Sequence, residues 1–151
     1  VIASNVPFTP NIQKISDSIE LNRNALIRAL QLLDKAELIR MIYKQTRSIS
    51  VLNKPDKIWM HNTNLMFAIG GENVEIGTIR ESFFIQNLSI NHLLTLPEKG
   101  DFLVDQQWLF EVGGKNKSLL GPIESEYFVA SDGIEIGTQN KIPLWLFGFL
   151  Y

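Results

Sequence analysis

Apolar residues early in the chain recur at helical spacing. Between residues 11 and 20 they stand at positions i, i+3 and i+7, as Ile12, Ile15 and Ile19. A second stripe recurs at intervals of four and three and runs to about residue 36, as Leu26, Leu30 and Leu33. This spacing predicts two amphipathic helices, and Asn22 precedes the second with a side chain suited to cap it. Because the connection is so short, the two are predicted to form a helix-turn-helix.

Strand-like segments follow these helices. Residues 38–43 alternate and are rich in β-forming types, and residues 57–61 form a second candidate after a turn at residues 53–56. The order helix, helix, strand, loop, strand is typical of a winged helix. The sequence therefore predicts a winged-helix domain over residues 1–64. The third helix that normally precedes such a pair is not expected in residues 1–10, which contain two prolines.

A different pattern begins after the glycine pair at residues 70 and 71. Thr78 and Glu81 match the S/T-x-x-E capping box, which predicts a helix start at this point. The residues expected on the inner face of this helix are Phe84, Ile85 and Leu88. The helix is predicted to end near His92.

Short strands are predicted beyond this helix. Residues 101–105 and 107–112 are expected to form a tight hairpin through Asp105 and Gln106, with another strand at residues 126–130. The alternating aromatic residues near the end favour a buried strand or tail, and they are Trp145, Phe147 and Phe149. The predicted fold class is α+β: a winged helix-turn-helix, then a small nuclease-like α/β domain with a mixed sheet over residues 65–151.

Charge differs between the two halves. The chain of 151 residues has a net charge of -2, but residues 1–64 hold nine Lys and Arg against five Asp and Glu, and residues 65–151 hold five against eleven. The halves thus carry +4 and -6. A basic winged helix favours contact with duplex DNA. The residues expected to make it are Arg23, Asn24 and Arg28 on the second helix, with Lys44 and Arg47 on the wing. The alternative is a partner-contact module whose charges are only solvated.

Several classes of protein are excluded or disfavoured. The chain has no cysteine, which excludes a disulfide scaffold and a thiolate zinc site. The longest apolar stretch, residues 142–151, is half the roughly 20 residues that a membrane-spanning helix needs. A chain that begins at Val1 without a signal peptide is expected to be a piece of a larger cytoplasmic protein. The GxxxxGK[ST] phosphate loop does not occur, so ATP is not expected to bind within these residues.

Acidic residues at predicted strand ends favour a metal site. Asp101 begins one strand of the hairpin and Glu111 ends the other, so both carboxylates could hold one divalent cation such as Mg²⁺. A lysine would then offset charge at the attacking water. Position 113, which shares a face with Glu111, is glycine, and Lys115 could come back only through a turn at the glycine pair before it. The structural alternative makes Glu81 a helix cap, Asp101 a turn residue, and the lysines at 115 and 117 solvated.

The two histidines favour no metal site. His61 and His92 are far apart in sequence and have no carboxylate or histidine neighbour at ligand spacing.

Several of these segments resemble the C-terminal region of predicted prokaryotic AAA-superfamily ATPases. They are residues 35–40, 54–65, 77–84, 100–105, 110–117 and 140–151, so the resemblance spans almost the whole chain. It implies an ATPase module upstream in the same chain, which would bind the ATP. It also implies a C-terminal domain of unknown function similar to the PD-(D/E)xK nucleases.

The resemblance also implies residue roles in that nuclease-like domain. The helix glutamate falls on Glu81, the aspartate on Asp101, the second acid on Glu111, and the lysine has Lys115 as a displaced candidate. The chain departs from the pattern at Gly100, where proline would precede the aspartate. His61 stands where relatives often have aspartate.

Three functions remain in competition. The first is a DNA- or partner-recognition region of an ATPase that is not catalytic by itself. The second is a metal-dependent DNA nuclease, and the third is a protein-interaction or oligomerisation module of the ATPase.

Overall fold

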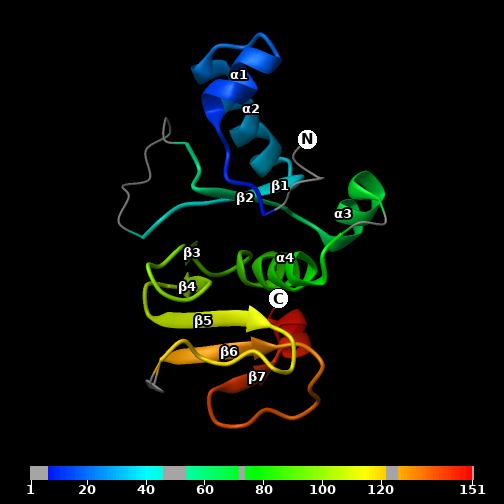
Figure 1. The fold of residues 1–151 in the computed structure, drawn as a ribbon, viewed down its shortest axis with the longest axis vertical. Helices are drawn as coiled ribbons and strands as arrows, with labels where there is room; N and C mark the ends of the chain where they lie inside the picture. Colours follow the sequence, from blue (N-terminus) through cyan, green and yellow to red (C-terminus); the bar gives the residue numbers. More distant parts are fainter. Residues whose placement is uncertain (1–6, 46–53, 72–73, 122–125, 151) are drawn as a thin grey trace. The chain divides into compact units, whose positions relative to one another are not determined.

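The chain forms two compact units in the computed structural model, Val1–Val74 and Glu75–Tyr151 (Figure 1). The structure describes residues 7–45, 54–71, 74–121 and 126–150. The division falls after residue 74, whereas the sequence pattern placed it near residue 64. As predicted, the fold is α+β and includes a mixed sheet. Among the described residues, none of the helices combines the length and apolar character needed to cross a membrane.

Two helices begin the first unit, as the apolar stripes predicted. They are α1 (Ile12–Ser18) and α2 (Arg23–Lys35). Each starts at an asparagine whose side chain accepts a backbone N–H: Asn11 from Lys14 at 3.1 Å, and Asn22 from Ala25 at 2.9 Å. The buried face of α2 consists of Leu26, Ile27 and Leu30. The predicted cap at Asn22 is therefore confirmed.

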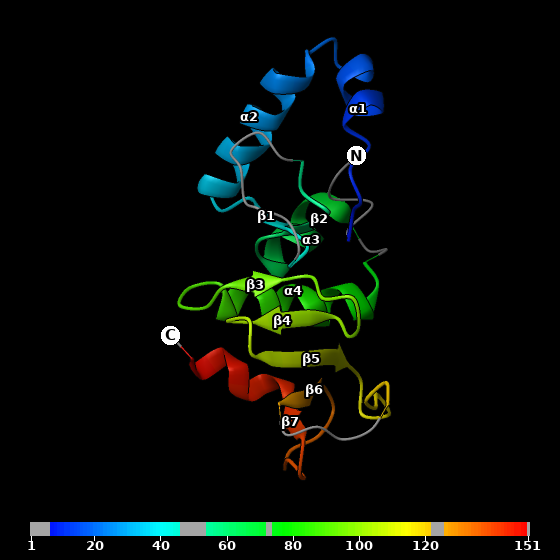
Figure 2. The ribbon, with the colours of Figure 1, turned by 90° about the vertical axis from the view of Figure 1, so that its left-hand side faces the viewer.

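A two-stranded antiparallel sheet completes the order helix, helix, strand, strand. It pairs β1 (Ile39–Ile42) with β2 (Lys57–Met60) (Figure 2). An antiparallel bridge joins Phe8, before the first helix, to Ile58 in the second strand, with N···O distances of 2.9 Å in both directions. The sheet thus gains a short third partner from the segment in which no helix was expected. Trp59 is 1% exposed, so this sheet contributes directly to the core of the unit.

The helix α3 (Thr63–Gly70) was not predicted. Its N-cap is Asn62, whose side chain accepts the N–H of Asn64 at 2.7 Å. Met66 is completely buried, whereas Phe67 and Ile69 are exposed. Since apolar residues occupy both the inner and the outer side of this helix, its sequence shows no amphipathic period.

The second unit is built on a five-stranded sheet in the order β3-β4-β5-β6-β7 (Figures 1 and 2). Its strands are β3 (Leu94–Thr95), β4 (Phe102–Val104), β5 (Trp108–Gly113), β6 (Tyr127–Ser131) and β7 (Lys141–Pro143). The first three strands are antiparallel, and the last two add in parallel to β5. The hairpin turn between β4 and β5 has positive φ at Asp105 (52°) and Gln106 (59°). Val104 pairs with Trp108, so residues 105–107 form the loop, and the N–H of Gln107 donates to the carbonyl of Val104 at 3.0 Å. The predicted hairpin is confirmed.

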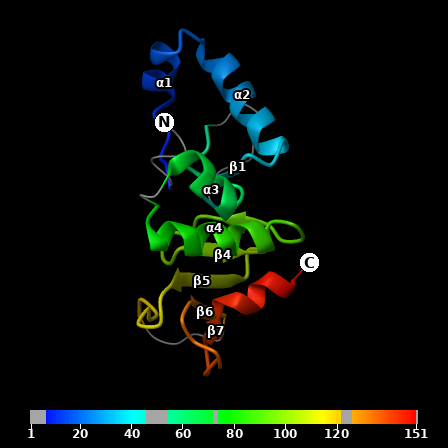
Figure 3. The ribbon, with the colours of Figure 1, turned by 90° about the vertical axis from the view of Figure 1, so that its right-hand side faces the viewer.

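Two helical segments cover one face of this sheet: α4 (Ile76–Leu88) and the 3-10 helix η1 (Leu144–Phe149) (Figure 3). Phe84 of α4 stacks near Phe102 and Phe110 with ring centroids 5.6 and 5.1 Å away, and Phe147 of η1 lies 4.9 Å from Phe84. The inner face predicted for α4 is therefore confirmed.

Two predicted details of these helices are wrong. The N-cap of α4 is Glu75, without a side-chain cap, so the helix begins before the T-x-x-E pattern and Glu81 is not a capping residue. Thr78 is instead buried within the first turn. The last residues form η1 rather than a strand, and its buried residues, Leu144 and Phe147, recur at the three-residue period of a 3-10 helix. Phe149 is 68% exposed.

Candidate functional site

The hairpin brings Asp101 and Glu111 together. Phe102 pairs with Phe110 across the two strands, and the N–H of Asp101 donates to the carbonyl of Phe110 at 2.9 Å. Asp101 directly precedes Phe102 and Glu111 directly follows Phe110, so the two residues lie at the same end of the paired strands. Because side chains alternate along a strand, both carboxylates point to the face opposite the two phenylalanines. That face is not the one on which α4 packs.

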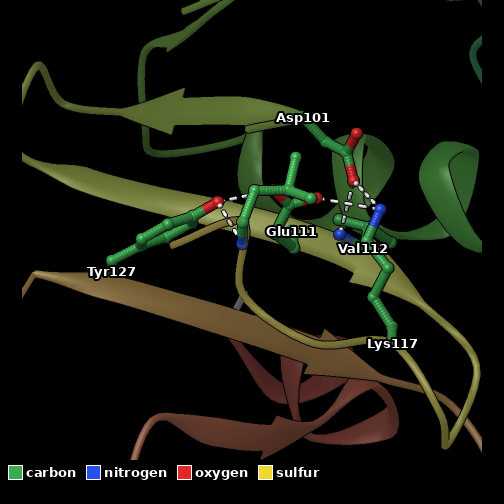
Figure 4. Close-up of polar contacts among 6 residues, drawn as sticks. Asp101, Glu111, Val112, Lys117 and Tyr127 are labelled. Atoms are coloured by element: carbon green, nitrogen blue, oxygen red, sulfur yellow. Dashed lines mark hydrogen bonds and ion pairs between the residues drawn. The ribbon is translucent and has the colours of Figure 1, made fainter. Parts of the chain in front are cut away.

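A lysine lies between these two carboxylates, and it is Lys117 (Figure 4). Its Nζ is 3.1 Å from Oδ2 of Asp101 and 2.8 Å from Oε2 of Glu111. We call Asp101, Glu111 and Lys117 the carboxylate–lysine cluster. The structure thus places Lys117 between the acids, where the sequence analysis expected Lys115. The side chain of Lys115 is exposed, and its backbone carbonyl accepts a hydrogen bond from Lys141 Nζ at 2.6 Å.

A turn at the glycine pair explains why Lys117 reaches the acids. The N–H of Lys117 donates to the carbonyl of Gly114 at 2.9 Å. A Cβ on Gly113 would lie 2.9 Å from both Cβ and Cγ of Lys117, so the lysine stem packs directly over this glycine. The lysine that was expected at position 113 is thus supplied by Lys117, four residues later. In the sequence, the signal for this contact was the glycine pair followed by Lys115 and Lys117. The alternation of side chains along a strand could not show how the loop after the glycines folds.

Further hydrogen bonds complete the cluster (Figure 4). The hydroxyl of Tyr127 donates to Oε1 of Glu111 at 2.5 Å and accepts the N–H of Leu120 at 3.2 Å. The N–H of Val112 donates to Oδ2 of Asp101 at 2.8 Å. Sequence analysis did not find Tyr127, because its role depends on the parallel pairing of β6 with β5.

Burial and charge set the electrostatics of the cluster. The side chain of Glu111 is 1% exposed, whereas those of Asp101 and Lys117 are 28% and 32% exposed. Oε2 of Glu111 has the geometry of an ion pair with the ammonium rather than of an aligned hydrogen bond. Burial acts to lower the pKa of Lys117, but the bonds to Glu111 and Asp101 outweigh it and raise the pKa. Burial and the bond to Glu111 raise the pKa of Tyr127.

The fit of this cluster to a divalent cation is partial. Two carboxylates on one face are a suitable anchor for Mg²⁺, which commonly binds one or two protein carboxylates and completes its shell with water or phosphate. In this arrangement, however, the ammonium lies between the carboxylates and pairs with Oε2 of Glu111. In the part of the chain that the structure describes, no group of three or more acidic, histidine or cysteine side chains is placed to hold a metal. A cation would therefore have to displace Lys117 from Glu111.

Glu81, the predicted helix glutamate, lies half-buried on α4. That helix packs against the sheet face formed by Phe102 and Phe110, on the other side from the cluster.

The predicted DNA-contacting residues are divided among faces of the first unit. Asn24 and Arg28 are exposed, and at 3.6 residues per turn they lie on one line opposite the buried leucines. This line, which we call the α2 polar stripe, consists of Asn24, Arg28, Gln31 and Lys35. Arg23 is exposed on a different side of the helix. Lys44 is exposed beside β1, and Arg47 lies outside the described residues.

The histidines have separate surroundings. His92 does have a carboxylate partner that spacing did not reveal: its Nδ1 is 2.6 Å from Oδ2 of Asp105, whose Oδ1 accepts the N–H of Leu93 at 2.8 Å. These bonds lower the pKa of Asp105 and tie the hairpin turn to the segment after α4. Burial, and then the charge of Arg40, lower the pKa of His61. Neither histidine lies in the cluster.

Comparison with family models, curated proteins and solved structures finds no match for this chain.

Proposed function

We propose that the chain is a DNA-recognition region of a larger AAA-type ATPase and has no catalytic activity of its own. The observation that carries the proposal is the α2 polar stripe. It presents an arginine, a lysine and two amide side chains along one line of a helix, while Leu26 and Leu30 anchor the opposite side in the core.

These residue types suit the major groove of DNA. An arginine can donate two hydrogen bonds to guanine, and asparagine or glutamine can pair in the same way with adenine. A lysine at the end of the helix would contact phosphate. In a helix-turn-helix, the second helix enters the groove, and here the second helix is α2. The two-stranded sheet that follows it is the expected place of a wing.

The distribution of charge also favours the first unit as the one that contacts DNA. Over its full length, Val1–Val74 holds nine Lys and Arg against six Asp and Glu, a net charge of +3. Residues 75–151 hold five against ten, a net charge of -5. Phosphate binding by the first unit would be salt-dependent because it releases counterions. Membership of a longer ATPase, with ATP bound only in the upstream module, rests on the sequence resemblance.

We expect Arg28→Ala to weaken binding to duplex DNA by about fivefold or more, because loss of a base-reading arginine costs roughly 1–3 kcal/mol. Fluorescence anisotropy with a labelled duplex, measured at several salt concentrations, gives both the affinity and its salt dependence. Lys115→Ala is the matched control, since it removes one exposed positive charge from the other unit. An affinity for DNA that changes neither with salt concentration nor on Arg28→Ala would favour a protein-interaction or oligomerisation module instead.

A second candidate function is a metal-dependent DNA nuclease. It is favoured by Lys117, which supplies the basic group that the sequence lacked at position 113. If a divalent cation displaced this ammonium, Asp101 and Glu111 would hold the ion and Lys117 would be free to offset charge at an attacking water. The burial of Glu111 and its bond to Tyr127 oppose this exchange.

We expect the purified chain to leave a labelled duplex intact in Mg²⁺ or Mn²⁺, because the ammonium already neutralises the carboxylates. Gel analysis of the duplex, with and without EDTA, measures this. Cleavage that requires the metal and disappears in both Asp101→Asn and Glu111→Gln, but not in Lys115→Ala, would make the nuclease the preferred function.

A further inference from the structure

A cavity of about 430 Å³ lies in the first unit, away from the α2 polar stripe. Two of its lining residues are cations from distant parts of the sequence: Arg23, the first residue of α2, and Lys54, which precedes β2. The remaining lining side chains include the neutral polar groups of Thr9, Asn11 and Gln13. None of the described residues that line it is acidic.

Two cations around one cavity without an acid between them repel each other, and an anion would relieve this repulsion. Gln13 donates its amide to Asp17 at 2.7 Å, so the nearest described carboxylate on α1 is already engaged along its own helix. Asn11 uses its side-chain oxygen to cap α1, which leaves the amide N–H₂ as a donor. The amide of Asn11 and the two cations thus bring hydrogen-bond donors to the cavity, as an anion requires.

We infer that this cavity binds one phosphate group of a nucleic-acid backbone, with Arg23 and Lys54 as its two cationic partners. The inference rests on the proposed function. Arg23 belongs to the same helix as the α2 polar stripe but lies on another side, so it cannot contact base edges together with Arg28. Contacts to phosphate fix the register of a recognition helix, while contacts to bases specify the sequence.

The test is the slope of log K against log salt concentration for duplex binding by the full chain. Each neutralised phosphate contributes about 0.9 to this slope. We expect Arg23→Gln/Lys54→Gln to lower the magnitude of the slope by about 0.9, the value for one shared phosphate, and to weaken different duplex sequences equally. Arg23→Lys keeps the charge and should retain the slope. Lys115→Gln is the control for loss of charge elsewhere.

The outcomes separate this inference from the proposed function. Salt-dependent binding that is the same in the double variant and in Lys115→Gln would overturn the phosphate site and leave DNA recognition standing. A decrease of about 1.8 would mean two separate phosphates and would also overturn the shared site. Absence of any duplex binding by the unsubstituted chain would instead defeat the proposed function. A last outcome would be that inorganic phosphate perturbs the cavity residues in a titration, while the variants leave DNA binding unchanged. It would assign the site to free phosphate and overturn the assignment to the nucleic-acid backbone.

Discussion

Replacement of Lys117 by methionine is expected to destabilise the second unit by about 3 kcal/mol. Removal of one partner of a buried ion pair costs roughly 3–5 kcal/mol, because the remaining charge is left without compensation. Here the remaining charge is Glu111, whose side chain is 1% exposed. The lower end of the range applies because Lys117 is itself 32% exposed and partly screened by solvent.

Urea denaturation monitored by tryptophan fluorescence measures this loss. The matched control is Lys115→Met, which removes an exposed lysine two residues away and should change the free energy of unfolding little. The double variant Glu111→Gln/Lys117→Met should be more stable than Lys117→Met alone, because neither charge is then left buried. Equal stability of Lys117→Met and Lys115→Met would show that the cluster does not hold this unit together.

Alkaline pH gives a second measure of the same cluster. The pKa of Lys117 is raised in the folded chain, so its contribution is present below the unfolded value of about 10.4 and is lost as pH rises through the folded value. Tyr127 also has a raised pKa, so the unfolded state ionises first and stability again falls. The free energy of unfolding should decrease above about pH 10, and less steeply in Lys117→Met.

Truncation of Phe84 to alanine is expected to destabilise the second unit by about 4 kcal/mol, within the range of roughly 3–5 kcal/mol for a buried phenylalanine. Phe84 is 0% exposed and contacts the rings of Phe102, Phe110 and Phe147. Its removal would leave a cavity between α4, the sheet and η1, which the surrounding rings cannot close.

The matched control for this variant is Phe149→Ala, since Phe149 is 68% exposed on η1. We expect that substitution to change stability by less than about 1 kcal/mol, as is usual for exposed sites. Thermal denaturation of both variants, monitored by circular dichroism, measures the two losses of stability. If Phe149→Ala lowered the stability as much as Phe84→Ala, the description of Phe84 as a core residue between α4 and the sheet would be wrong.

Local signals predicted much of the fold. The stripes of isoleucine and leucine located α1 and α2, and Asn22 capped the second helix as its side chain indicated. Asp105 and Gln106 formed part of the hairpin turn, and that hairpin brought Asp101 and Glu111 to the same end of the paired strands. These features depend on neighbours within a few residues, where periodicity and turn chemistry are informative.

Features that depend on tertiary contacts were missed. The position of Lys117 is determined by a loop that packs on Gly113, and Tyr127 reaches Glu111 only through parallel strand pairing. The helix α3 has apolar residues on both sides, so it shows no periodic signal. Thr78 matched the pattern of an N-cap, but α4 begins before it, and the side chain of Thr78 is buried in the first turn of that helix.

The most direct measurement of the central claim is an amide NMR titration of the chain with duplex DNA. DNA recognition by α2 predicts that the amide resonances of Arg23–Lys35 shift most, that those of the carboxylate–lysine cluster shift little, and that added salt reverses the changes. Shifts confined to residues 75–151, or no shifts at DNA concentrations that saturate other helix-turn-helix domains, would contradict the account.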